Sequence, residues 1–187
     1  MNKKKEQNLP TKLACCSHTA TLVGSLLVIF GGWDAPIVFS DVYILDLVTF
    51  EFVKPDVQGD IPSPRRCGIT IFIVSNDFLT ISWHTATLLP NGSIFVYGGF
   101  DGNDASNDAF VLSGVSTTPS EPHQLKWTKV STALLASARA GHTCTLSSDA
   151  EHLVVFGGGD NEGRYFNGTD IFPADKFLNM STGASFV

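Results

Sequence analysis

Three histidines stand at matching positions of the sequence, and their spacing is the first feature that suggests chemistry. His18, His84 and His142 open the stretches HTATL, HTATL and HTCTL. Imidazole is the commonest side-chain ligand for zinc, so three copies invite a metal site. Because they recur once per repeat, however, we expect them to lie one repeat apart and not in one ligand shell. The pattern therefore predicts hydrogen-bonded structural histidines and no metal.

Aspartates form a second repeated series. Each is followed two residues later by an aromatic side chain: Asp41 with Tyr43, Asp108 with Phe110, and Asp170 with Phe172. Acid–base catalysis would need a second carboxyl group converging on the first, and none can be assigned. We therefore expect these carboxylates to accept backbone N–H groups in loops. A Ser or Cys nucleophile motif does not stand out either, and no catalytic residue is assigned.

Two segments have the composition of ligand sites. Residues 100–108, FDGNDASND, are acidic enough to suggest calcium, but Ala105 and Leu112 stand where an EF-hand places oxygen ligands. Residues 157–163, GGGDNEG, are glycine-rich but lack the lysine and following helix of a phosphate-binding loop. Both segments are expected to be connecting loops, and no cofactor is predicted.

These residues belong to a unit of roughly 50 residues that occurs three times. After each histidine stretch an apolar run closes on two glycines: Gly31-Gly32, Gly98-Gly99 and Gly157-Gly158. The aspartate–aromatic stretch follows, and a later short strand carries Phe52 in the first unit and Trp127 in the second. Asn91-Gly92 is a strong hairpin signal because both residues tolerate positive φ. Each unit predicts four short antiparallel strands, the plan of a propeller blade.

The pattern resembles the kelch repeat from about Ala14 to Asp175. The matching features are the diglycine, the aspartate–aromatic strand, the later Trp127, and an arginine lead-in before the histidine strand at Arg65-Arg66 and Arg139. The resemblance implies an all-β, kelch-type β-propeller. Kelch propellers usually close with about five to seven blades, so about three four-stranded blades imply an incomplete ring. The repeated histidines, diglycines, aspartates and aromatic residues are then structural.

The repeat also sets the expected boundaries. Residues 1–13 form a polar tail, and blades are expected at about residues 14–62, 63–134 and 135–187, the last of them incomplete. Residues 68–82 interrupt the second unit, and removing them restores the Arg-x-x-His spacing seen at Arg139 and His142. We hypothesise a retained intron translated in frame, or a gene-prediction error. The alternative is a true insertion forming a β-hairpin of residues 69–74 and 78–81, whose apolar composition favours aggregation.

Charge and composition narrow the class of partner. The net charge is −6, whereas a protein that binds phosphate backbones needs a basic surface, so nucleic acid is not expected. No signal peptide or membrane-spanning segment is visible. The four cysteines contain no C-x-x-C pair. A cytoplasmic location with free thiols is expected.

The resemblance implies a protein–protein interaction module or scaffold. Loops between strands collect on one face of a rigid ring, where they can vary without disturbing the core. We expect contacts from residues 33–40, 100–106 and 159–168, because aromatic and arginine side chains favour interface centres. The candidate contact residues in these loops are Trp33, Asp34, Phe100, Asp101, Arg164 and Tyr165. The expected partner is another protein.

Two alternatives remain. A copper oxidase of the galactose oxidase class has a kelch-type fold and uses Tyr and His from several blades, but Tyr43, Tyr97 and Tyr165 cannot be matched to its active site. The second alternative is a non-functional fragment of a longer kelch protein, because open blade edges are a liability. Self-association into a closed six-blade ring, or further chain on either side, would cover these edges.

Overall fold

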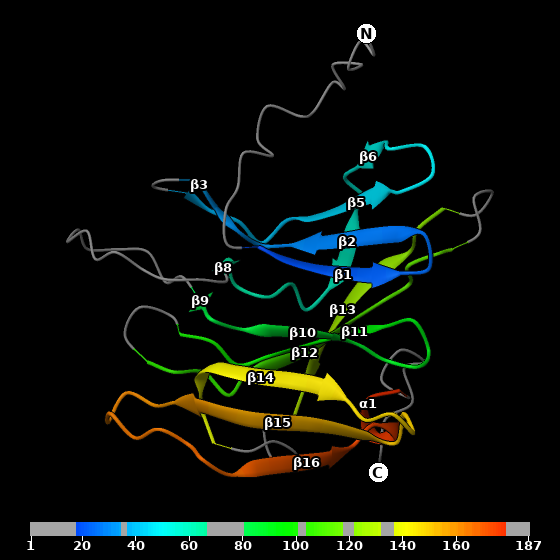
Figure 1. Cartoon of the computed structure of the whole chain (residues 1–187). Coiled ribbons are helices and arrows are strands. Elements are labelled where there is room, and N and C mark those ends of the chain that lie inside the picture. Colours follow the sequence, from blue (N-terminus) through cyan, green and yellow to red (C-terminus); the bar gives the residue numbers. More distant parts are fainter. Residues whose placement is uncertain are drawn as a thin grey trace, which may run out of the picture.

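The computed structural model of the chain describes residues 18–34, 37–66, 81–100, 104–117, 122–131 and 137–178. They form short strands in three sheets that follow one another along a stack (Figure 1). The first strands of these sheets, β1 (Thr19–Val23), β10 (Thr85–Leu88) and β14 (Ala140–Leu146), are neighbours at the interfaces between sheets. The expected all-β fold of kelch-type blades is confirmed, and the described blades form a stack and not a closed ring.

The first sheet has the order β1-β2-β5-β6, all antiparallel. Its further strands are β2 (Leu26–Phe30), β5 (Val42–Asp46) and β6 (Phe52–Val53). A small hairpin of β3 (Trp33–Asp34) and β4 (Ile37–Val38) extends beyond the end of β2. Side chains alternate between the two faces of a strand, and the face of Val28 and Ile44 is buried against the second sheet.

The second sheet has the order β10-β11-β12-β13-β7. Its further strands are β11 (Ile94–Tyr97), β12 (Ala109–Ser113), β13 (Leu125–Val130) and β7 (Val57–Gly59). β7 pairs in parallel with β13, although it lies within the range expected for the first blade, residues 14–62. The chain therefore crosses to the second sheet earlier than the repeat pattern suggests, and β7 ties the first two blades together.

The third sheet has the order β14-β15-β16, with β15 at His152–Gly159 and β16 at Thr169–Pro173, and the helix α1 follows at Asp175–Leu178. Its register differs from the sequence alignment. Ile29 and Val96 oppose Tyr43 and Phe110, but the corresponding Val155 opposes Asp170. Asp170, and not Phe172, thus takes the place of the aromatic residue. The loop before Asp170 is longer than the corresponding loops of the first two blades. The Asp170 carboxylate pairs with the buried side chain of Arg139.

Two short strands, β8 (Arg65–Arg66) and β9 (Ile81–Ser82), pair in parallel next to the interruption of the second unit. Both interpretations concern residues 68–82, and residues 68–80 of this segment lie outside the described ranges. They remain hypotheses.

Apolar side chains form one core in each gap between neighbouring sheets. The core between the first two sheets includes Phe30, Ile44, Val96 and Trp127, and the core between the second and third includes Phe95, Tyr97, Leu153 and Phe177. Burying each such side chain contributes roughly 1.5–3 kcal/mol, so the faces between sheets stabilise the stack. Within the described ranges, no helix has the length and apolar character needed to cross a membrane.

Candidate functional site

The loops that follow the three diglycines leave the stack at the same end, on the left of Figure 1. One hydrogen bond closes each loop: the N–H of Phe39 donates to Gly32, that of Ser106 to Gly99, and that of Phe166 to Gly158, at 2.9, 2.7 and 2.9 Å. The repeated diglycines therefore fix the base of each loop. The residues between are free to differ from blade to blade, as expected for a variable contact surface.

A cleft of about 630 Å³ opens at this end, between the second and third sheets. Its walls are aromatic and glycine residues with two polar side chains: Trp83, Phe100, Ala140, Gly141, Gly158, Gly159, Asp160, Asn161, Tyr165 and Phe166. Ligand sites are commonly concave and largely apolar, with a few polar groups that fix orientation. The cleft has this kind of lining, with Asp160 and Asn161 as its charged and amide side chains.

Trp83 forms one wall of the cleft in an unusual backbone conformation. Its φ of 60° lies in the left-handed region, which is rare for a bulky residue. The corresponding residue before His142 is Gly141, with φ of 71°, so the position itself requires this conformation. The Trp83 ring lies 5.8 Å from that of Phe100, and its carbonyl accepts a hydrogen bond from Gly141 N–H at 3.1 Å. Among the described residues Phe50 shares this conformation, with φ of 58°, but Trp83 is the one that lines the cleft.

The two loops that border the cleft are fastened to each other. Asn161 donates from its side-chain amide to Asp104, and its Oδ1 accepts a hydrogen bond from Ala105 N–H at 2.8 Å. On the outer side, Arg164 pairs with Asp160 at 2.7 Å and with Glu162 at 3.0 Å. The Asn161 contacts join the loops of the second and third blades, whereas the Arg164 pairs lie within the loop of the third blade.

Arg139 supports the cleft from below. Its guanidinium is 3 % exposed, pairs with Asp170 at 2.5 Å, and lies 4.5 Å from the centre of the Phe166 ring. Its backbone N–H donates to Ser106 and its carbonyl accepts from Gly99, both in the second blade. The lead-in arginine noted in the sequence thus links the second blade to the third directly beneath the cleft.

The repeated histidines lie between sheets. His142 Nε2 is 3.0 Å from Thr85 Oγ1, and its ring lies 4.9 Å from that of Tyr97. Burial, and then the charge of Arg139, lowers the pKa of His142 to about 4. His84 is buried in the gap before it, 5.8 Å from the Phe30 ring. The imidazoles are thus separated by a whole sheet, which is unlike the arrangement of ligands around one metal ion.

The repeated aspartates find basic partners. Asp41 pairs with Lys54 at 2.8 Å and Asp108 with Lys129 at 2.9 Å, both at partly exposed positions. Each lysine also lies over the aromatic ring of the same series, at 5.5 Å from Tyr43 and 5.7 Å from Phe110. We expected backbone N–H donors, and the structure places a lysine ammonium group against the carboxylates of Asp41 and Asp108.

The structure brings together some of the candidate contact residues. Phe100 and Tyr165 share the cleft, and Tyr165 is 88 % exposed. Arg164 lies at its rim through the pair with Asp160. Trp33 and Asp34 form β3, which pairs with β4 in a separate two-stranded sheet. Asp34 does not line the cleft. Asp101 lies outside the described residues.

The prediction from sequence did not include Trp83; Asn161 and Phe166 lie in the predicted contact loop 159–168 but were not named as contact residues. The available signal was the position of Trp83, immediately before the repeated histidine, where the third unit has Gly141. A bulky residue in place of glycine in an otherwise regular repeat points to a role outside the architecture.

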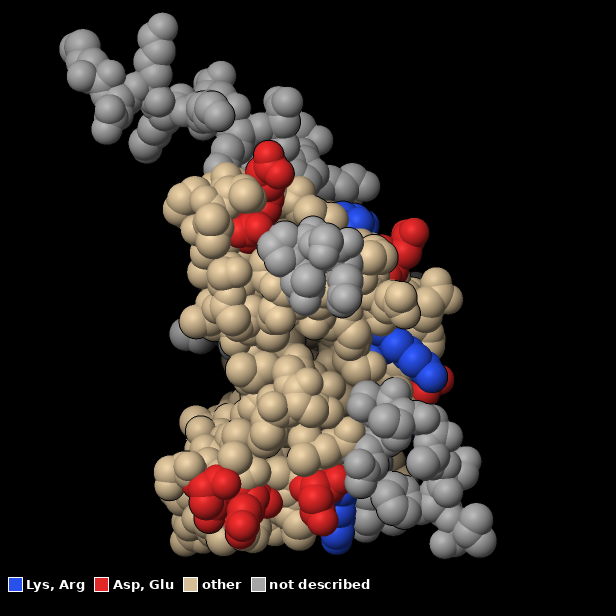
Figure 2. Space-filling model, turned by 90° about the vertical axis from the view of Figure 1, so that its right-hand side faces the viewer, with Lys and Arg blue, Asp and Glu red and all other residues tan. Residues whose placement is uncertain are grey.

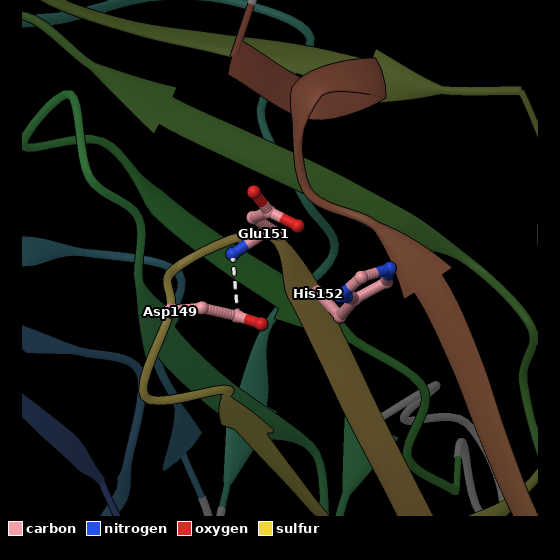
Figure 3. A group of neighbouring side chains, drawn as sticks. All are labelled: Asp149, Glu151 and His152. Atoms are coloured by element: carbon pink, nitrogen blue, oxygen red, sulfur yellow. Dashed lines mark hydrogen bonds between the residues drawn. The ribbon is translucent and has the colours of Figure 1, made fainter.

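A separate cluster lies at the opposite end, in the turn between β14 and β15 (Figure 3). Asp149, Glu151 and His152 bring three potential ligand atoms within 4.8 Å of one another, a spacing compatible with a cation. Asp149 Oδ1 already accepts hydrogen bonds from Ser147 and from Glu151 N–H. These contacts account for the cluster as a capped turn. Figure 2 shows this turn-bearing end: uncharged surface covers most of it, and acidic side chains gather at its lower edge, over the third blade.

The comparisons with known proteins agree with this architecture. Residues 14–54 match the Kelch motif. The chain is 32 % identical over 159 residues to acyl-CoA-binding domain-containing protein 4 of Arabidopsis thaliana, covering 83 % of this chain and 20 % of that protein. It is 28 % identical over 145 residues to the Rho GTPase-activating protein gacHH of Dictyostelium discoideum, covering 76 % of this chain and 8 % of the relative.

A third relative has kelch repeats in its name. The Rab9 effector protein with kelch motifs of Gallus gallus is 28 % identical over 99 residues, covering 51 % of this chain and 22 % of that protein. The chain spans less than a quarter of the length of each of these three relatives. What is shared is thus the repeat region. With its diglycine blades and the motif match, this chain belongs to the kelch-repeat family.

Proposed function

We propose that the chain is a protein-interaction module that binds an extended segment of a partner protein in the cleft between the second and third blades. The observation that carries the proposal is Trp83, held at positive φ where the neighbouring repeat has glycine, with its ring facing Phe100. A left-handed conformation costs a bulky residue roughly 1–2 kcal/mol. Such a cost is retained where the side chain serves recognition.

The chemistry of the walls favours a peptide with apolar or aromatic side chains. Trp83, Phe100 and Tyr165 offer large, rigid surfaces that lose little conformational entropy on binding. Asn161 and backbone groups of Gly158 and Gly159 give polar atoms that can orient a main chain. Trp33, Asp34, Asp101 and Arg164 are proposed as further contacts for a partner that extends across the loop end. The Rab9 effector is by its name a partner of another protein, which agrees with this class of function.

Binding is favoured over catalysis because the acidic groups beside the cleft are already engaged. Asp160 is paired with Arg164, and Asp104 accepts from Asn161. A general acid or base must be free to exchange a proton with a substrate. We accordingly propose no reaction at this site.

The proposal can be tested with a phage-displayed random peptide library selected on the purified chain. We expect enriched peptides to share apolar or aromatic residues. Their affinity should fall at least about tenfold, or about 1.4 kcal/mol, for Trp83→Gly and Tyr165→Ala. Val48→Ala is the matched control, because Val48 is also an exposed apolar side chain but lies at the opposite end. Failure to enrich peptides, or equal binding by all three variants, would refute the proposal.

A further inference from the structure

The first strand of each blade packs onto the blade before it by a repeated set of contacts. In the gap between the second and third blades, His142 meets Thr85 and Tyr97, and Thr87 Oγ1 donates to the carbonyl of Cys144 at 2.9 Å. Cys144 and Leu146 of β14 pack against the core of this gap. The third blade therefore docks through alternate residues of β14.

The gap between the first and second blades repeats this arrangement one blade earlier. His84 packs against Phe30, which corresponds to Tyr97, and Ala86 and Leu88 of β10 pack against the core as Cys144 and Leu146 do. Each blade thus has two distinct faces: a docking strand that contacts the preceding blade, and a receiving face that accepts the following one.

Among the described residues, no further sheet packs on the receiving face of the third blade (Figure 1). Phe156 corresponds to Phe30 and Tyr97, yet it is 51 % exposed, whereas they are 3 % and 0 % exposed. Ile171 lies opposite Val154, as Val111 lies opposite Phe95. Ile171 is 60 % exposed and Val111 is 1 % exposed. An apolar face of this kind marks an interaction surface.

The threonines of this face are repeated as well. Thr143 and Thr145 oppose Phe156 and Val154 in the register, so they point to the same face, and both are exposed. They correspond to Thr85 and Thr87, which hydrogen-bond to the docking strand of the next blade. The face therefore presents the hydrogen-bonding groups of a receiving face together with its apolar residues.

At the other end of the stack, the docking strand of the first blade is exposed. Leu22 on β1 is 53 % exposed, and Ala20 and His18 on the same side of the strand are exposed too. These residues correspond to Leu88, Ala86 and His84 in the second blade. One chain thus carries an exposed docking strand at one end and an exposed receiving face at the other. Their residues match those of the docking strands and receiving faces that pack together between its own blades.

We propose that two copies of this chain associate head to tail, with β1 of one copy docked on the outer face of the β14-β15-β16 sheet of the other. The contact is heterologous, because it joins two different surfaces, and such contacts build closed rings or open chains. A self-facing contact between two copies of the third blade would bring Phe156 against Phe156, without the histidine and leucine that the receiving face accepts. The inference does not depend on the binding cleft.

Sedimentation velocity of the whole chain over a range of concentrations tests the proposal. We expect the wild-type chain to form a dimer or longer assembly that dissociates on dilution. Phe156→Asp and Leu22→Asp should each weaken association at least tenfold, since each places a charge in an apolar contact. Both side chains are exposed, so folding should survive, and circular dichroism verifies this. Val48→Asp, a charge at another exposed apolar position, should leave association unchanged.

Mixing the two interface variants makes the test specific. The Leu22→Asp chain retains an intact receiving face, and the Phe156→Asp chain retains an intact docking strand. An equimolar mixture should therefore recover a dimer through one wild-type contact, although neither variant associates alone. A wild-type chain that stays monomeric at all concentrations, association that survives either variant, or a mixture that behaves like the single variants would overturn the proposal.

Discussion

At the scale of single residues, Gly98 shows why the diglycine is needed. Its φ is +67°, and a Cβ there would lie 2.6 Å from His142 Cε1 and 2.7 Å from the Arg139 carbonyl oxygen. Gly98→Ala combines backbone strain with a clash in the gap between blades, so the free energy of unfolding should fall by about 3 kcal/mol or more. Urea unfolding followed by fluorescence measures this change.

Gly92→Ala is the matched control for that experiment. Gly92 has φ of +80°, but an added Cβ would meet no atom within 4 Å. Only the strain of an alanine at positive φ remains, so the free energy of unfolding should fall by about 1 kcal/mol. Equal losses for the two variants would show that the close approach of His142 to Gly98 has no energetic weight.

Replacing Trp83 should affect stability much less than replacing the buried Trp127. Trp83→Gly relieves the strain of positive φ while removing a partly exposed ring, and these effects oppose each other, so stability should change by less than about 1 kcal/mol. Trp127 is 1 % exposed in the core between the first two blades, and Trp127→Ala should cost about 3–5 kcal/mol. Thermal or urea unfolding of both variants compares them. A large loss for Trp83→Gly would assign Trp83 to the architecture instead.

His142 should make stability depend on pH. Its pKa of about 4 in the folded chain, set by burial and then by Arg139, lies below the ordinary histidine pKa of 6.5. Between these values the unfolded chain binds the proton and the folded chain does not, so the free energy of unfolding falls as the pH falls from 6.5 to 4. The total loss is on the order of 3 kcal/mol.

The variant His142→Gln isolates this contribution, because carboxylates titrate in both proteins. The difference in unfolding free energy between wild type and variant should shrink as the pH is lowered from 7 to 4.5. A difference that stays constant over this interval would mean that His142 titrates alike in the folded and unfolded chains.

At the scale of the elements, Arg139 connects the second and third blades. Arg139→Met removes the partner of Asp170 and the donor to the Gly157 carbonyl. The Asp170 side chain is 40 % exposed, so loss of the ion pair itself should cost about 1 kcal/mol. Loss of the buried hydrogen bond to Gly157 should bring the total to roughly 2 kcal/mol, and the third blade should exchange its amide protons faster than the first. Lys129→Met is the control: the lysine and Asp108 side chains are 51 % and 32 % exposed, so less than about 1 kcal/mol is expected. Hydrogen exchange that rises evenly over all blades would contradict this role.

Some of the strands and their pairings could be predicted from the sequence alone, and others could not. The histidine and diglycine strands were predictable, because each carries a local signal, apolar runs and turn residues, that repeats three times. The parallel pairing of β7 with β13 was not, since Val57–Gly59 is too short to carry periodicity and its partner lies about seventy residues away. The register of β16 depends on Arg139 and the longer loop before Asp170, which are tertiary effects. The cleft was partly predictable: Phe100 and Tyr165 follow from the loops. The sequence also shows Trp83 where the third unit has Gly141, but the positive φ that makes this substitution costly is known only from the structure.

At the scale of the whole molecule, the stack separates two kinds of surface. The cores between blades and the repeated histidine contacts fix the relative position of the sheets. The diglycine loops meet at one end of the stack, where the cleft lies between two blades. Because the walls of the cleft come from sequence positions as distant as Trp83 and Tyr165, the site exists only when both blades are docked. Variants that separate the blades, such as Arg139→Met, should therefore weaken peptide binding along with stability.

The most direct test of the binding cleft is fluorine NMR of the chain labelled with 5-fluorotryptophan, titrated with a peptide enriched from the library. The chain has three tryptophans, and replacing each in turn with phenylalanine assigns the signals. We expect the peptide to shift the Trp83 signal and to leave that of the buried Trp127 in place. A peptide that binds with the Trp83 signal unmoved, or that moves Trp127 alone, would contradict a binding site in the cleft.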